Sequence, residues 1–180
     1  MTIVIALAIH EVGHLIAAIM LNIKFQRFKI TLFGFNLDAD LENVSLIKKI
    51  ILFFAGPFFN IIVFCMLRYT KYYNFANINI FLSIVNMIPI VPLDGGNLCK
   101  AVLESILDSM AVCRYIIMTN CFFIVCFLVI MYMYKNWMYL LLIMMAVRGI
   151  LDENNHLFEK SIKYNYYNRL KKHSRAANRR

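Results

Sequence analysis

Long apolar runs with very few charges are the feature that most restricts how this chain can fold. Hydrophobic residues make up 62% of its 180 residues, a proportion that excludes an ordinary soluble domain. Several runs approach the roughly 20 residues that a membrane-spanning helix needs. We therefore predict an all-α membrane protein with about five transmembrane helices. The predicted spans lie near Met1–Ile23, Ile50–Leu67, Ile78–Leu93, Tyr115–Tyr134 and Trp137–Leu151.

These spans use most of the chain and leave no room for a second globular domain. We expect residues 1–151 to form one membrane-embedded core and residues 152–180 to form a polar, basic tail. Between the first two spans, Ile30, Leu32 and the aromatic residues around Gly34 alternate loosely with polar positions. This pattern predicts a small β element on the inner, cytosolic side of the membrane.

The net charge of +9 is explained by membrane topology. If the first helix runs from outside to inside, most lysines and arginines fall on the inner side, and only Arg68, Lys71 and Lys135 remain outside. The opposite orientation violates the positive-inside rule. The prediction is a cytosolic carboxyl terminus whose basic tail contacts anionic lipid headgroups, with no nucleic-acid partner.

Two of the ten acidic residues, Glu11 and Asp94, lie within or at the edge of an apolar span. Ionisable groups in a bilayer are costly and mark functional sites. Glu11 follows His10, and His14 lies four residues after His10, so both imidazoles project from the same side of a helix. This spacing suits one zinc ion, and Glu11 is placed to take a proton from zinc-bound water.

A catalytic zinc site needs a third protein ligand. The remaining histidines, His156 and His173, lie in the tail, which leaves Asp94 as the candidate. Gly13 is expected to leave room beside the metal, and Gly95 and Gly96 to let the chain turn after Asp94.

The third predicted span is the least lipid-like. Asn79, Ser83 and Asn86 share one helical face, which we expect to face the bundle and to offer water a route. Pro89 and Pro92 should break the helix before Asp94.

The second span contains the segment Ala55-Gly56-Pro57-Phe58-Phe59-Asn60. A packing kink and a direct role at the site are equally compatible with it.

These residues resemble the site-2 protease family of intramembrane zinc metalloproteases, and most closely its sporulation branch. The matching features are His-Glu-x-x-His on one helix and, later in the chain, the segment Asn86-Met-Ile-Pro89-Ile-Val-Pro92-Leu93-Asp94-Gly95. The segment from Ala55 to Asn60 is also similar to the family. The resemblance implies that His10, His14 and Asp94 bind Zn²⁺, that Glu11 is the general base, and that Asn86 lies near the scissile peptide.

For the sporulation branch, the resemblance implies a membrane-associated substrate, the precursor of the late mother-cell sigma factor. It also implies membrane-bound inhibitor proteins as partners and a location in the membrane around the forespore. The strand around Ile30–Phe35 is expected to bind an extended substrate. Three alternatives stay open: the same protease acting on another target, such as an anti-sigma factor or a signal-peptide remnant; a zinc-binding transporter or chaperone; and an inactive scaffold.

Overall fold

The structure, a computed structural model, describes residues 1–180 apart from 24, 32–33, 40, 42–43, 156 and 159–180. It contains two compact units, the first comprising Met1–Leu107 and the second beginning at Asp108. The predicted boundary at residue 151 falls inside the second unit. Most of the predicted tail lies outside the described residues, so the division into a core and a tail stays a prediction.

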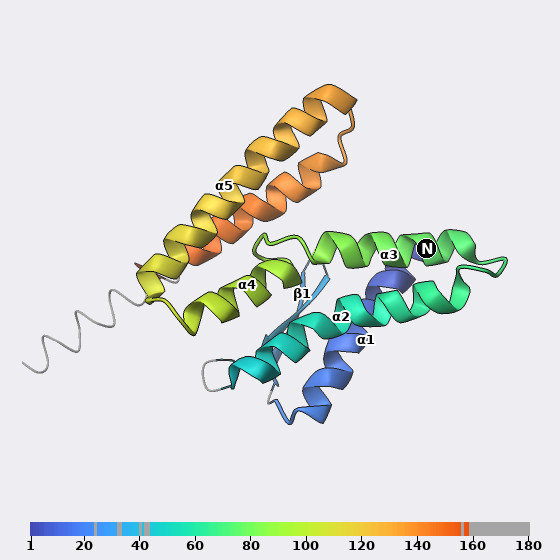
Figure 1. The fold of residues 1–180 in the computed structure, drawn as a ribbon, viewed down its shortest axis with the longest axis horizontal. Helices are drawn as coiled ribbons and strands as arrows, with labels where there is room; N and C mark the ends of the chain where they lie inside the picture. Colours follow the sequence, from blue (N-terminus) through green and yellow to red (C-terminus); the bar gives the residue numbers. More distant parts are fainter. Residues whose placement is uncertain (24, 32–33, 40, 42–43, 156, 159–180) are drawn as a thin grey trace, which may run out of the picture. The chain divides into compact units, whose positions relative to one another are not determined.

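The first unit is built around one central helix. Helix α2 contacts α1, α3 and α4, and it lies side by side with α3 (Figure 1). The elements, in chain order, are α1 (Thr2–Met20), β1 (Phe25–Thr31), β2 (Gly34–Ala39), α2 (Leu46–Leu67), α3 (Tyr73–Asn86) and α4 (Asp94–Glu104).

The two strands form an antiparallel hairpin in the stretch where the sequence predicts a short β element. Their register pairs Phe28 with Leu37 and Thr31 with Gly34. The cytosolic position of this element stays a prediction.

Small residues allow α1 and α2 to approach closely, as is common between membrane helices. Ala17, Ala18 and Ala55 are buried in the core that they form with Ile23 and Leu52. The end of α1 is also held to α2, because the Lys48 ammonium donates to the Leu21 carbonyl at 2.9 Å.

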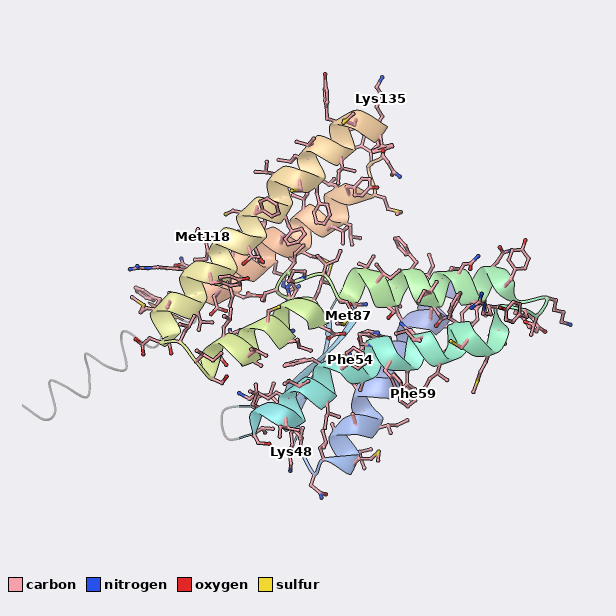
Figure 2. All side chains as sticks on the ribbon, in the orientation of Figure 1. Lys48, Phe54, Phe59, Met87, Met118 and Lys135 are labelled. Atoms are coloured by element: carbon pink, nitrogen blue, oxygen red, sulfur yellow. The ribbon has the colours of Figure 1, made fainter. Side chains whose placement is uncertain are left out.

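Gly13 lies in this helix contact, and its expected role beside the metal stays a prediction. A Cβ at Gly13 would lie 2.9 Å from the Ala55 carbonyl oxygen and 3.0 Å from the Phe59 ring, which projects from α2 (Figure 2). The glycine therefore permits backbone approach.

Helix α3 ends at Asn86, before both prolines, as the sequence predicts. Asn79 and Ser83 are buried, and the Ser83 hydroxyl donates to the Pro57 carbonyl of α2 at 3.1 Å. The polar face thus points into the bundle, as predicted. Its first two members are packed against protein, and the expected water route along this face stays a prediction.

Three described helices are long and apolar enough to cross a membrane: α1, α2 and α5 (Ser109–Tyr134). They carry large apolar side chains that are exposed in this chain, among them Ile19, Phe58 and Met118. Faces of this kind suit contact with lipid and indicate an integral membrane protein. Helix α3, with 14 residues, is shorter than a usual span, and the count of five spans stays a prediction.

In the second unit, α5 pairs with a helical segment at residues 139–155. The two run side by side and are joined by a turn after Lys135 (Figures 1 and 2). The fully buried Asn120 amide donates to the Ala146 carbonyl, and the Phe127 and Tyr139 rings stack.

Candidate metal centre

Three predicted ligands from two distant parts of the sequence meet at one point in the first unit. His10 and His14 lie one turn apart on α1 and are 4% and 7% exposed. Asp94 is the first residue of α4. Within the described residues, one ligand atom from each lies within 4.8 Å of the others.

The separations of these atoms fit a tetrahedral metal ion. Asp94 Oδ2 lies 3.0 Å from His10 Nε2 and 3.2 Å from His14 Nε2, and the two Nε2 atoms are 3.2 Å apart. Zinc bonds of 2.0–2.2 Å in a tetrahedron place neighbouring ligand atoms about 3.3 Å apart. The triangle therefore has close to the dimensions that zinc requires, and three protein ligands leave a fourth position open.

The orientation of His14 also favours a cation. Its Nδ1–H donates to the Leu52 carbonyl oxygen of α2 at 2.8 Å. A neutral imidazole with its proton on Nδ1 has only a lone pair on Nε2. That lone pair faces the Asp94 carboxylate, an arrangement that a positive ion between them stabilises. A backbone partner for the second ring nitrogen is typical of metal-binding histidines.

Helix α2 makes room for both rings at Gly56. A Cβ at this position would lie 2.3 Å from His14 Nε2 and 2.8 Å from His10 Nε2, closer than real contacts allow. Asn60, one turn further along α2, lies with its amide nitrogen 3.2 Å from His10 Nδ1. The segment from Ala55 to Asn60 therefore contributes directly to the site.

Asp94 is carried to the histidines by a tight connection between α3 and α4. Gly95 and Gly96 lie in the first turn of α4, directly against the backbone of the preceding loop. A Cβ at Gly95 would lie 2.3 Å from the Met87 carbonyl oxygen, and one at Gly96 would lie 2.2 Å from the Ile90 carbonyl carbon. These glycines are thus required by close packing of two backbone segments, and the turn itself precedes them.

The two predicted catalytic side chains differ in their placement. Glu11 is half-buried on α1, next to His10 in sequence. Asn86 is the last residue of α3, is half-buried, and donates from its amide to the Leu82 carbonyl of its own helix at 3.1 Å. The roles of both stay predictions.

The sequence did not identify the partners of the histidine rings on α2. The Leu52 carbonyl is a backbone group, which no side-chain pattern reveals. Gly56 and Asn60 could have been found from the sequence. They are four residues apart, so a small residue and an amide share one face of the helix.

Known proteins are similar to this chain in part of its sequence and in its fold. The sequence profile of Peptidase family M50 matches residues 68–131, a region that contains Asn86 and Asp94 but not the two histidines. No curated protein sequence matches the chain. A solved structure, the site-2 protease from Methanocaldococcus jannaschii, is similar with a TM-score of 0.70 and 19% sequence identity over 84% of this chain and 75% of that one. The chain therefore has the fold of that site-2 protease structure.

Proposed function

We propose that this protein is a zinc metalloendopeptidase of the site-2 type, which cleaves a peptide bond in or beside the membrane. The observation that carries the proposal is the triangle of His10, His14 and Asp94, whose two histidines lie on α1, a helix apolar enough to cross a bilayer, with Glu11 next to His10. The shared fold and the family match support it.

Each residue of the site has its own proposed role. His10, His14 and Asp94 would hold the ion. A bound zinc ion supplies Lewis-acid activation of a water molecule and of the scissile carbonyl. The Glu11 carboxylate accepts a proton from the attacking water and passes it to the leaving amine.

Asn86 would assist the developing oxyanion with its amide. Its bond to the Leu82 carbonyl uses one of the two hydrogens that an amide nitrogen carries. The second hydrogen can then be donated to substrate, which fits the place near the scissile peptide that the resemblance implies.

A non-catalytic zinc-binding protein is the second candidate. A transporter would need polar groups along a path through the protein, whereas Asn79 and Ser83 are buried and hydrogen-bonded to helix backbone. A scaffold that only retains the fold would not need Glu11. Both observations favour the protease.

For the substrate, we propose a membrane-associated sigma-factor precursor. This rests on the similarity of the motifs to the sporulation branch, that of stage IV sporulation protein FB. The same proposal includes a location in the membrane around the forespore and a cytosolic carboxyl terminus. It also includes membrane-bound inhibitor proteins as partners. An anti-sigma factor or another membrane substrate is the alternative target.

The test is co-expression of the chain with a tagged sigma-factor precursor, comparing the wild type with Glu11→Gln by gel mobility and by zinc content. We expect a clipped product with the wild type only, and equal zinc in both proteins, because glutamine cannot accept the proton but leaves the three ligands in place. Clipping by Glu11→Gln at the wild-type rate contradicts the proposed mechanism. A zinc-loaded wild type that clips an anti-sigma factor instead contradicts only the choice of substrate.

A further inference from the structure

Asn60 is a buried polar side chain that helix packing does not explain. It is fully buried on α2, and its amide nitrogen lies 3.2 Å from His10 Nδ1. Its side-chain oxygen Oδ1 is also buried and has no hydrogen-bond partner among the described residues. Leaving a buried acceptor without a partner costs stability, so the position needs a reason.

The reason lies in which ring nitrogen of His10 carries the proton. With the amide nitrogen of Asn60 toward Nδ1, a neutral His10 would have its proton on Nε2, which lies 3.0 Å from Asp94 Oδ2. A metal ion binds the lone pair of a neutral imidazole. When Nε2 binds metal, the proton must lie on Nδ1, where it would face the hydrogens of the Asn60 amide.

Reversal of the amide removes this conflict. An asparagine amide fills the same space after a half-turn, which exchanges its donor and its acceptor. Oδ1 then accepts from His10 Nδ1–H, and the oxygen that now has no partner gains one.

We propose that Asn60 is a positioning residue for the metal site. Its amide oxygen accepts from His10 Nδ1–H, which keeps the lone pair of His10 Nε2 directed at the metal. The inference rests on the metal site of the proposed function but not on proteolysis.

The two histidines differ in the partner of Nδ1. The partner of His14 Nδ1 is the Leu52 carbonyl, which can only accept a hydrogen bond. His14 is thus held permanently with its Nε2 lone pair toward the metal. His10 instead faces a side-chain amide, so the Asn60 oxygen must be turned toward Nδ1 for His10 to be held in the same tautomer.

The chain offers a matched control in Asn79. This asparagine on α3 is also fully buried with an unpartnered Oδ1, but its amide donates to the Phe75 carbonyl of its own helix. Loss of a buried asparagine is therefore common to Asn60→Leu and Asn79→Leu. Loss of a partner for a histidine ring is specific to Asn60→Leu.

The experiment measures zinc affinity of the purified full chain in detergent, by competition with a chromophoric chelator. The visible spectrum of the Co²⁺-loaded protein reports the ligand geometry. Removal of a partner behind a metal ligand typically weakens metal binding 10–100-fold. We expect that loss, with an altered Co²⁺ spectrum, for Asn60→Leu, and wild-type values for Asn79→Leu.

Asn60→Asp tests which hydrogen-bonding group His10 needs. Its carboxylate keeps an acceptor beside His10 Nδ1 and removes the amide donor. We expect it to retain wild-type zinc affinity and a wild-type Co²⁺ spectrum. If Asn60→Leu does not fold, Asn60→Ala takes its place in the comparison, with the same expected loss of zinc affinity. Unchanged affinity in Asn60→Leu, equal losses in Asn60→Leu and Asn79→Leu, or weak binding by Asn60→Asp would each overturn the proposal. A wild type without zinc would overturn both the metal site and the proposal for Asn60. A wrong protein substrate would leave the proposal for Asn60 intact.

Discussion

Replacement of Gly56 by alanine should disable the metal centre through a single methyl group. The added Cβ would lie 2.3 Å from His14 Nε2, 2.7 Å from His10 Cε1 and 2.8 Å from His10 Nε2. An ordinary contact begins at 3.4 Å, so the His14 ring must move by about 1 Å. The ring cannot yield freely, because its other nitrogen is held 2.8 Å from the Leu52 carbonyl.

A displacement of this size affects binding and chemistry together. A misplacement of about 1 Å in a catalytic site can cost about 100-fold in rate. We therefore expect Gly56→Ala to lose about 100-fold in proteolytic rate and at least about 10-fold in zinc affinity, the lower end of the effect of disturbing a ligand's surroundings. Overpacking adds a stability cost of about 1–3 kcal/mol.

The assay is zinc affinity by chelator competition, together with cleavage of the tagged substrate and thermal unfolding in detergent. Gly13→Ala is the control, because the atoms nearest to its Cβ belong to Ala55 and Phe59 on α2, whereas those nearest to a Cβ at Gly56 belong to the histidine rings. It should lower stability with a smaller effect on zinc. Full zinc affinity and full activity in Gly56→Ala would refute the claim that α2 fixes the space for the rings.

Two further substitutions test the supporting structure. Gly96→Ala places a Cβ 2.2 Å from the Ile90 carbonyl carbon, and because backbone cannot yield as a side chain can, α4 should shift with Asp94 and zinc affinity should fall at least about 10-fold in chelator competition. Ser83→Ala removes the hydrogen bond to the Pro57 carbonyl, and a reversible unfolding assay in detergent should show a loss of about 0.6 kcal/mol, with unchanged zinc affinity. A loss of zinc in Ser83→Ala would contradict the assignment of that contact to helix packing alone.

The cluster of His10, His14 and Asp94 was predictable because its chemistry is visible in the sequence. His10 and His14 have helical spacing, and acids within or at the edge of apolar segments are few enough that Asp94 stands out. Helix ends with strong local signals were predictable as well. Pro89 and Pro92 cannot continue α3, and the helix ends at Asn86.

Tertiary packing decided what the sequence did not reveal. Gly13 and Gly56 are both glycines in apolar helices, and only the crossing of α1 and α2 shows that the first faces a backbone and the second faces the ligands. The stripe with Asn79 and Ser83 fits a water route or a helix contact equally well as a pattern. The hydrogen bond to Pro57 shows that Ser83 takes part in a helix contact.

The central claim is that His10, His14 and Asp94 together hold one zinc ion. The most direct measurement is the zinc content of the purified wild type and of Asp94→Ala, determined by elemental analysis after gel filtration in detergent. Because Asp94 lies on a different helix from the two histidines, the comparison tests the metal and the fold that assembles its site. The account predicts about one zinc ion per wild-type chain and a clear loss in Asp94→Ala. A wild type without zinc, or an Asp94→Ala protein that retains it fully, would contradict the account.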